Sequence, residues 1–332
     1  MKRVLLVGLA LAGVALAVAL GVVRSALRPL EPGGAQQVFE VAAGESLPEI
    51  ARRLEEAGLV RSRLAVELVA RSRDLAGRLQ RGEYEVSPAQ SPREILEQIA
   101  SGRVISYEVA FPEGFTAAQF AERLARAGLA DRDAFLAVVR DRATPGLLGV
   151  EGASLEGYLF PETYRFARGT PPIEIARAMV GQFRQVWDEI APLARERGLS
   201  MRDVVILASL VEKETGADDE RPLIASVFLN RLRRGMRLET DPSVIYGIVG
   251  FDGNLRRRDL ENAANPFNTY RIPGLPPGPI ANPGAAALRA VVQPAQTDYL
   301  FFVSRNDGSH TFSKTYAEHV SAVNRYQRTG GS

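Results

Sequence analysis

The sequence predicts an α+β fold. It places an N-terminal transmembrane helix ahead of small α+β modules and a mostly helical C-terminal domain that carries a small β-hairpin. Three observations support this. An uninterrupted apolar run fills residues 4–23, a strand-and-helix unit is repeated at an offset of 70 residues, and an aliphatic helix ends at Glu212 and Glu214. The 332 residues, 46% hydrophobic and 24% charged, have globular composition and suffice for about two domains of roughly 150 residues.

Composition excludes several functional classes. The net charge is +2, and no stripe of arginines interleaved with aromatic residues is present, so a nucleic-acid partner is not expected. The absence of cysteine excludes a disulfide framework and a lipoprotein anchor on cysteine. Because the histidines are His310 and His319 alone, we do not expect a histidine-based metal site. No cofactor is predicted.

The N-terminal run predicts a membrane anchor. Every residue from Val4 to Val23 is Val, Leu, Ala or Gly, and a run of ~20 apolar residues is what crosses a bilayer. The alternative is a cleaved signal peptide, but that has a shorter apolar region, and the Ala-x-Ala patterns here lie inside the run. Lys2 and Arg3 favour a cytoplasmic N-terminus, although Arg24 and Arg28 weaken the charge asymmetry. We therefore expect a single-pass protein of the cytoplasmic (inner) membrane with its remaining domains on the outer, periplasmic face.

An internal repeat follows a Pro/Gly-rich linker. "GESLPEIARRLEEAGL" (residues 44–59) aligns without gaps with "GFTAAQFAERLARAGL" (residues 114–129). Each copy predicts a strand, a glycine turn, a helix capped by Ser46 or Thr116, and a stop at Gly58 or Gly128. Between them, "GEYEVSPAQSPREILEQIASG" predicts a further strand and amphipathic helix. Such β-α-α-β units resemble LysM domains, which bind cell-wall glycans. A plain α+β spacer is the alternative.

The stretch "SLEGYLFPETYRF" sets Glu156 beside a cluster of aromatic residues that begins at Tyr158. Carboxylates next to aromatic rings are typical of carbohydrate grooves, because sugars present apolar C–H faces together with hydroxyl groups. Core packing around a turn explains the same pattern.

The helix predicted over residues 201–215 carries the candidate acid. Glu214 continues the apolar stripe of Leu207, Leu210 and Val211, whereas Glu212 lies ~200° around the axis. Burial in that stripe and the negative end of the helix dipole near Gly216 both raise the pKa of Glu214. A carboxyl protonated near neutrality suits a general acid that protonates a glycosidic oxygen. The alternative is a helix end with two solvated glutamates.

Several blocks together resemble one family. "ASLVEKET", "VFLNRLRRGMRLETDPSVIYG", "NPFNTYRIPGLPPGPIANPG", "YLFFV…HTFSKTYAEH" and "SLEGYLFPETY" look like the signature blocks of the YceG/MltG family of membrane-anchored endolytic murein transglycosylases. The resemblance spans most of residues 37–326 in the same order. It implies cleavage of the MurNAc–GlcNAc β-1,4 bond in nascent peptidoglycan strands to give 1,6-anhydroMurNAc ends, and thereby termination of glycan elongation. It also implies that penicillin-binding synthases work nearby.

The family's catalytic glutamate maps onto Glu214, the same residue that the stripe indicates. A lytic mechanism needs one acid, whereas a hydrolase needs a second carboxylate, for which Asp241 in "TDPS" is the candidate, although that motif also fits a turn. A wall-binding scaffold without activity is a further alternative. The predicted substrate-binding residues are Glu156, Tyr158, Glu212, Asp241, Ser243, Tyr246, Asn268 and Tyr270.

The C-terminal motifs complete the prediction. The run "IPGLPPGPIANPG" cannot form a helix and predicts an extended loop, either a rim for the glycan or a connector. "YLFFV", "NDG" and "SHTFS" predict a β-hairpin in which His310 is a packed strand residue rather than a base. The predicted domains are the cytoplasmic tip and anchor (1–24), a linker (25–36), the LysM-like module (37–105), the second repeat unit (106–150), the catalytic domain (151–326) and a tail (327–332).

Overall fold

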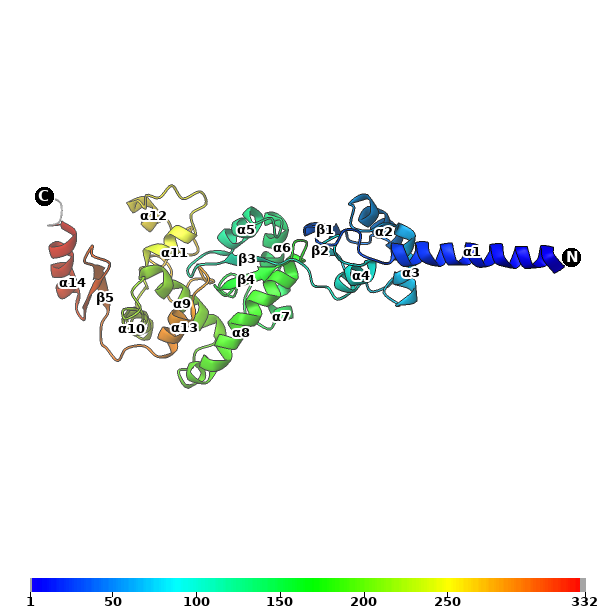
Figure 1. The fold of residues 1–332 in the computed structure, drawn as a ribbon. Helices are drawn as coiled ribbons and strands as arrows, with labels where there is room; N and C mark the ends of the chain where they lie inside the picture. The colour runs from blue at the N-terminus through cyan, green and yellow to red at the C-terminus, as the bar shows by residue number, and fades with distance from the viewer. Residues whose placement is uncertain (1, 329–332) are drawn as a thin grey trace. The chain divides into compact units, whose positions relative to one another are not determined.

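The chain divides into two compact units, which are described separately. A computed structural model describes residues 2–328, without the side chains of residues 2–10 and 12. Unit 1 comprises Met1–Tyr107 and Arg165–Gly169, and unit 2 comprises Glu108–Tyr164 and Thr170–Ser332. Both combine helices with two-stranded sheets (Figure 1), so the predicted α+β class is confirmed.

The N-terminal prediction needs correction. The chain forms helix α1 at Lys2–Ala26. Within the described residues, however, no helix combines the length and the apolar character that crossing a membrane requires. A membrane-spanning helix needs ~20 apolar residues. In α1 the structure describes the side chain of Leu11 and the side chains from residue 13 onward. Residues 4–10 and 12 of the predicted span lie outside the described side chains. The prediction of a transmembrane helix is therefore wrong for the described chain.

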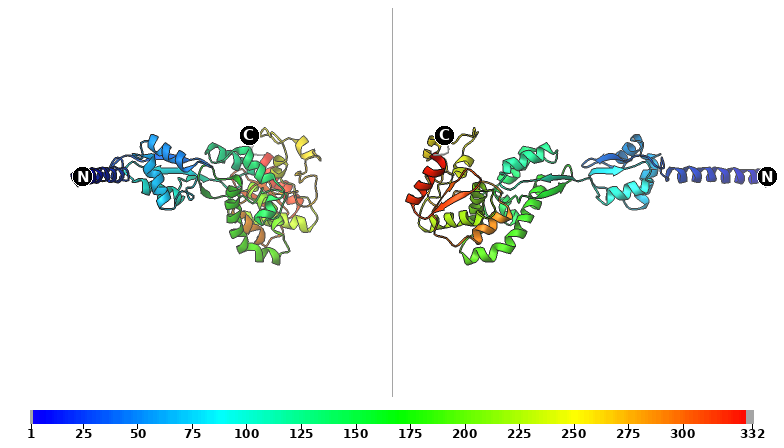
Figure 2. Two further views of the ribbon diagram at one scale, coloured as in Figure 1. Left: turned by 90° about the vertical axis from the view of Figure 1, so that its right-hand side faces the viewer. Right: turned by 60° about the vertical axis from the view of Figure 1, so that its left-hand side comes forward.

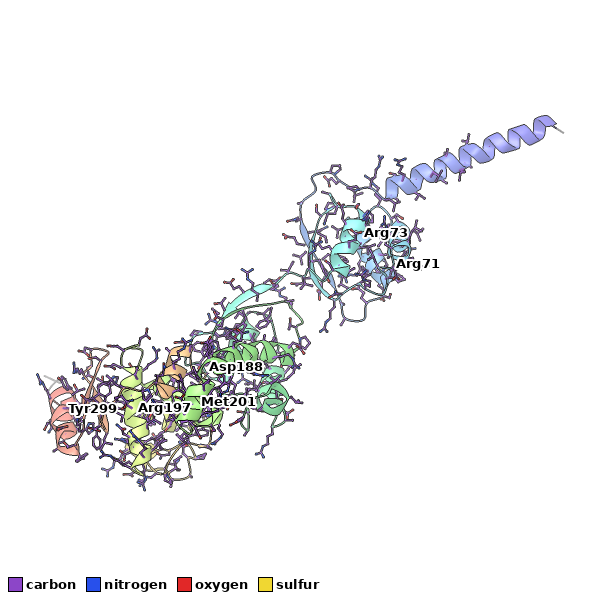
Figure 3. All side chains as sticks on the ribbon, turned by 90° about the horizontal axis from the view of Figure 1, so that it is seen from below. Arg71, Arg73, Asp188, Arg197, Met201 and Tyr299 are labelled. Carbon is purple, nitrogen blue, oxygen red and sulfur yellow. The ribbon has the colours of Figure 1, made fainter. Side chains whose placement is uncertain are left out.

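Unit 1 encloses its own hydrophobic core. Its further elements are β1 (Gln37–Val41), α2 (Leu47–Glu56), α3 (Arg63–Ser72), β2 (Gly82–Val86) and α4 (Pro92–Ala100). Strands β1 and β2 pair antiparallel with Phe39 opposite Tyr84, and both of these rings are buried. Helix α3 ends near Arg71 and Arg73, which Figure 3 labels. The β-α-α-β order is as predicted, while the LysM-like assignment stays a prediction.

The two repeat copies share their local chemistry. Helix α2 begins after Ser46, and α5 (Ala117–Arg126) begins after Thr116, each with a capping box. Both helices stop at a glycine in the left-handed region, Gly58 (φ 67°) and Gly128 (φ 66°). These positions favour glycine because a Cβ strains that conformation. The repeat therefore encodes the same start and stop in both units.

Unit 2 is mostly helical. Its strands are β3 (Tyr107–Ala110), β4 (Thr163–Phe166), β5 (Phe301–Ser304) and β6 (His310–Ser313), and the boundary between the units falls in β3 and β4. Besides α5, its helices are α6 (Arg132–Arg140), α7 (Thr144–Leu148), α8 (Pro172–Glu196), α9 (Met201–Glu214), α10 (Arg221–Arg233), α11 (Asp241–Tyr246), α12 (Arg257–Glu261), α13 (Ala285–Val292), α14 (Tyr316–Val323) and a π-helix at Asn324–Arg328.

Helix α9 is the central helix of unit 2. Ser200 caps it in a capping box with Asp203, and every residue from Val204 to Val211 is buried. It packs against α8, α10, α11 and α13. The helix ends at Glu214 because Thr215 is extended, so Gly216, which we expected to mark the end, lies just beyond the cap.

The C-terminal hairpin agrees with the prediction. Strands β5 and β6 pair antiparallel, with Phe302 opposite Phe312, and Asn306 in the connecting turn has a φ of 66°. Helix α14 packs against both strands and α10 packs against β5 (Figure 2). These contacts bring the hairpin and α14 to the end of α9.

Two loops for which contact with the glycan was one of two alternatives have residues packed in the interior. In the proline-rich run, which has no helix or strand, Ile280, Ala281 and Asn282 are buried, and the Ile280 amide donates to Ser209 Oγ of α9 (3.1 Å). In the 155–160 loop, a Cβ on Gly157 would lie 2.6 Å from Val205 Cγ1. Only glycine lets this loop approach α9 so closely.

Candidate active site

The last residue of α9, Glu214, faces the start of α11. Thr240, the residue before α11, donates its hydroxyl hydrogen bond to Glu214 Oε1. Thr240 is itself buried, and its amide donates to Thr269 Oγ1 (2.9 Å). The acid is thus held by a residue that has its own fixed partner.

The surroundings of Glu214 shift its proton affinity. Burial raises the pKa of the Glu214 carboxyl from 4.5 to about 7, and the negative charge of Asp241 adds to the rise. The Thr240 hydrogen bond and the positive charges of His310 and Arg231 oppose it. The direction is the one predicted, and it leaves a substantial fraction of Glu214 protonated at neutral pH.

Glu214 opens into a pocket of about 300 Å³ within unit 2. Its polar lining includes the carboxylates of Glu214, Glu239 and Asp241 and the guanidinium of Arg231. Its aromatic lining is formed by Tyr270, Phe301, Phe302, Tyr316 and His319. A concave site with convergent polar groups and an acid of raised pKa is the arrangement expected of an active site.

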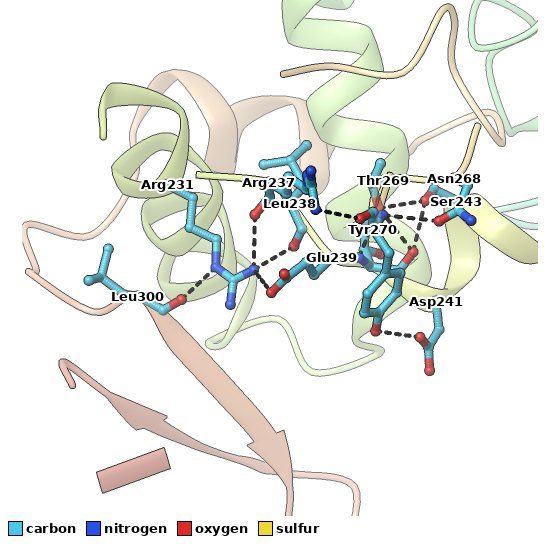
Figure 4. Close-up of polar contacts among 11 residues, drawn as sticks. Arg231, Arg237, Leu238, Glu239, Asp241, Ser243, Asn268, Thr269, Tyr270 and Leu300 are labelled. Atoms are coloured by element: carbon cyan, nitrogen blue, oxygen red, sulfur yellow. Dashed lines mark hydrogen bonds and ion pairs between the residues drawn. The ribbon is translucent and has the colours of Figure 1, made fainter. Parts of the chain in front are cut away.

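Asp241 and Tyr270 meet in this pocket. The Tyr270 hydroxyl donates to Asp241 Oδ1 at 2.7 Å, as Figure 4 shows. Burial, followed by the bond to Asp241, raises the pKa of Tyr270, so the phenol keeps its proton and remains a donor. Two of the predicted substrate-binding residues therefore lie in the same pocket as Glu214.

Arg231 joins the segments that line the pocket. Its Nε donates to the Leu300 carbonyl (2.6 Å), and its Nη1 donates to the Leu238 carbonyl (2.9 Å) and to Glu239 Oε2 (3.0 Å) (Figure 4). Its guanidinium also lies over the Phe301 ring, 5.1 Å from the centroid. Glu239 has a φ of 51°, unusual for a residue with a side chain. Arg231 thus ties α10 to β5 and to this turn.

Glu212 lies in different surroundings from Glu214. Its side chain is 5% exposed; Oε1 accepts from Arg221 Nη2 (3.2 Å) and Oε2 accepts from the Gly284 amide (3.0 Å). Since both oxygens are engaged in the interior and Glu212 does not line the pocket, its geometry is that of a buried ion pair rather than of a substrate-binding group.

Glu156, Tyr158 and Tyr246 also lie away from the pocket. Glu156 is buried; its Oε1 accepts from the Ala117 amide (2.9 Å) and its Oε2 from the Tyr246 hydroxyl (3.1 Å). Burial raises the pKa of Glu156 to about 7. Tyr158 is buried and donates to the Glu151 carbonyl. Because Tyr246 belongs to α11, Glu156 holds the far end of the helix whose start contacts Glu214.

Ser243 and Asn268 shape the backbone beside the acid. Ser243 Oγ donates to the Thr240 carbonyl (2.8 Å). The Asn268 amide group donates to the carbonyls of Asp259, Leu260 and Asn262. Both side chains are fully buried, so they support the turn that carries Thr240 and Tyr270. The "TDPS" motif itself is the start of helix α11 rather than an isolated turn.

His310 is paired on the other side of the helix end. Its Nδ1 lies 2.6 Å from Glu220 Oε2, and its amide donates to Glu220 Oε1 (2.7 Å). Burial raises the pKa of Glu220, but its hydrogen bonds from His310 bring the pKa below the ordinary value. Thr215, next to Glu214, donates to the same carboxylate (3.4 Å). His310 is thus a packed strand residue with a fixed partner.

Sequence reasoning missed part of the pocket. Thr240, Arg231 and Glu239 were not among the predicted site residues, nor were Phe301, Tyr316 and His319. Thr240 directly precedes Asp241, and the other residues stand in the quoted family blocks, so the signal was present. What the sequence lacked was the pairing that brings α10, β5 and α14 to the end of α9.

Comparison with known proteins agrees with this organisation. The sequence model of the YceG-like family matches residues 39–325. The endolytic murein transglycosylase of Bacillus subtilis is 30% identical over 320 residues, which cover 91% of this chain and 88% of that protein. That of Streptococcus pneumoniae serotype 2 is 28% identical over 342 residues, but the alignment covers 61% of its length, so this chain spans less than two thirds of that relative.

A solved structure extends the match to the fold. The crystal structure of a YceG-like protein from Listeria monocytogenes superimposes with a TM-score of 0.59 at 30% identity, covering 86% of this chain and 98% of that chain. The family match covers most of the sequence and includes the helix that ends in Glu214, the Thr240–Asp241 turn and the hairpin. This chain belongs to the YceG-like family.

Proposed function

We propose that the protein is an endolytic murein transglycosylase that cuts the MurNAc–GlcNAc β-1,4 bond within peptidoglycan strands and leaves 1,6-anhydroMurNAc ends. The observation that carries the proposal is the carboxyl of Glu214, whose pKa burial raises to about 7 in a pocket lined by further carboxylates and aromatic rings. The names of the relatives from Bacillus subtilis and Streptococcus pneumoniae support the reaction class.

In the proposed mechanism Glu214 acts first as an acid and then as a base. Its carboxyl proton passes to the glycosidic oxygen as the bond between C1 of MurNAc and that oxygen breaks, which leaves a free hydroxyl on GlcNAc. The C6 hydroxyl of the same MurNAc then attacks C1 and gives its proton to the Glu214 carboxylate. The proton balance closes without water, and the acid is regenerated.

The other pocket groups have supporting roles in this mechanism. The positive charge that develops at C1 lies near the Asp241 carboxylate, which favours that transition state. The Thr240 hydroxyl fixes the rotamer of Glu214, and Tyr270 fixes that of Asp241. Fixed partners of this kind keep the reacting groups aligned before the sugar arrives.

The nearest rival is a hydrolase in which Asp241 activates water or attacks C1 directly. The observation that supports this alternative is that Asp241 lines the same pocket as Glu214. Retaining and inverting hydrolases both need a second carboxylate across the bond, whereas a lytic enzyme does not.

Product analysis separates the two reactions. Purified protein incubated with peptidoglycan is expected to release fragments with anhydro ends, which lack the mass of one water relative to reducing ends. Mass spectrometry of the fragments distinguishes them. Reducing MurNAc ends would show that water is the nucleophile, and release of no fragments from a folded protein that sediments with the wall would favour a non-catalytic scaffold.

We place this activity outside the cytoplasm, where peptidoglycan strands are assembled. Acting on nascent strands, the enzyme would terminate glycan elongation. A terminator has to meet a strand while it is being made, so we also propose that penicillin-binding synthases work beside it.

A further inference from the structure

The pocket beside Glu214 has an aromatic wall that the proposed chemistry does not use. Tyr316, the first residue of α14, lines the pocket although 68% of its surface is exposed. Exposed tyrosines that border a pocket offer a ligand an apolar face with little loss of side-chain freedom. Such a ring next to a catalytic acid calls for an explanation beyond packing.

The rings behind Tyr316 support it. Phe301 makes an edge contact with Tyr316, with centroids 5.9 Å apart and planes at 61°. Phe301 also stacks on His319 (5.1 Å, 22°) and lies under the Arg231 guanidinium. Because Phe301 is engaged with these neighbours, it serves as a buttress, and Tyr316 is the ring left open.

His319 is held in this wall by stacking. Its Nδ1 is buried and has no hydrogen-bond partner among the described atoms. A buried imidazole without that partner is costly, and the ring contacts of Phe301 and Tyr316 are what retain it. The wall is therefore built from ring contacts contributed by β5 and α14.

We infer that Tyr316, buttressed by Phe301 and His319, is the stacking platform for a single uncharged N-acetylhexosamine ring of the glycan, next to the bond that Glu214 protonates. This inference rests on the proposed function. The pocket volume of about 300 Å³ is at the lower end of the range of ligand pockets, which suits one ring rather than several.

The polar lining and the size of the pocket select the kind of sugar. The carboxyl groups of Glu214, Glu239 and Asp241 line the cavity. The Arg231 guanidinium donates its hydrogen bonds to Glu239 and to the backbone carbonyls of Leu238 and Leu300. This lining offers acceptors for sugar hydroxyls and for the N–H of an acetamido group. The ring stacked on Tyr316 is accordingly the GlcNAc unit, because a pocket of about 300 Å³ that suits one ring leaves little room for the lactyl group and attached peptide of MurNAc.

Steady-state kinetics with soluble glycan strands test the platform. Tyr316→Ala is expected to raise KM about tenfold with little change in kcat, because it removes the ring face on which the sugar stacks; a tenfold change corresponds to about 1.4 kcal/mol. Tyr316→Phe keeps the ring and should stay within about twofold of wild type. Val320→Ala, one turn further along α14 and outside the lining, is the matched control.

A direct binding measurement removes the dependence on turnover. Chitotetraose, an oligomer of GlcNAc, is titrated into Glu214→Gln and into the Glu214→Gln, Tyr316→Ala double variant, with thermal melting to confirm that both are folded. The single variant should bind about tenfold more tightly than the double variant.

The outcomes separate the inference from the proposed function. If Tyr316→Ala leaves KM and chitotetraose affinity unchanged while anhydro products still form, the platform is wrong and the function stands. If Tyr316→Phe loses as much as Tyr316→Ala, the hydroxyl rather than the ring face matters, which also overturns stacking. If Glu214→Gln retains full activity, the proposed function itself fails.

Discussion

Glu212 and Glu214 lie two residues apart on α9, yet they are held by different parts of unit 2. Glu212 is paired with Arg221 and accepts from Gly284, whereas Glu214 accepts from Thr240 and lines the pocket. The same helix end thus carries a structural carboxylate and a candidate acid. Substituting the two residues identically distinguishes these roles.

Glu214→Gln keeps the side-chain size but cannot give up and regain a proton as the acid does. We expect a loss of at least about 10²–10⁴-fold in kcat, the range for a general acid, because the same group also acts as the base. Glu212→Gln is the matched control. It should lower stability, since Arg221 loses a buried partner, but should keep most of the activity of the folded protein.

The measurements are kcat on soluble strands and melting temperature for both variants. Loss of turnover in a folded Glu212→Gln protein, with Glu214→Gln still active, would reverse the assignment.

The second prediction concerns the pH dependence of the rate. Since the acid must start protonated and its pKa is about 7, kcat/KM should fall as the pH rises above about 7. The Thr240 hydrogen bond lowers the pKa of Glu214, so Thr240→Val, which removes it at similar volume, should raise that pKa and move the alkaline limb to higher pH. A pH–rate profile of the two proteins tests this, and a limb that moves to lower pH would contradict the role of Thr240.

The third prediction concerns stability, because Glu156 is buried and has a folded-state pKa of about 7 against 4.5 for the ordinary carboxyl. Between these values the folded chain binds more protons than the unfolded chain, so the free energy of unfolding falls as pH rises through this window. The slope is at most about 1.4 kcal/mol per pH unit for one group. Below 4.5 and above about 7 this contribution is constant.

Glu156→Gln imitates the protonated form, so it should flatten this part of the pH dependence. Glu214→Gln should likewise remove the part that arises from the raised pKa of Glu214. Urea denaturation at several pH values between 4.5 and 8 measures how the free energy of unfolding of each protein depends on pH. An unchanged slope in Glu156→Gln would show that the carboxyl is not protonated in the folded protein.

The local signals in the sequence were sufficient for much of the fold. Ser46 and Gly58, and again Thr116 and Gly128, fix the start and stop of their helices through chemistry that a single sequence displays. The hairpin at residues 301–313 was predicted equally well, because an apolar run precedes a turn of Asn, Asp and Gly and a second short strand follows it.

Only part of the candidate site could be predicted from the sequence, and the reason is physical. An apolar stripe separates a buried face from a wet one, but α9 is buried all round from Val204 to Val211, so the stripe could not show that Glu212 is buried too. Nor could it show that the side chains of Glu156 and Tyr246, 90 residues apart, are hydrogen-bonded to each other. Such pairings depend on tertiary packing, which produces no periodic pattern in the sequence.

The last prediction concerns unit 1. Its hydrophobic core is formed by residues between Phe39 and Ala100, so deleting residues 37–105 removes a complete core rather than part of one. The acid and the pocket belong to unit 2. If unit 1 binds glycan as a LysM-like module, the deletion should reduce co-sedimentation with insoluble peptidoglycan while anhydro products still form from soluble strands. The full chain carrying Glu214→Gln is the control for binding without cleavage. Equal sedimentation of the deletion variant and this control would assign wall binding to unit 2 and leave unit 1 as a spacer.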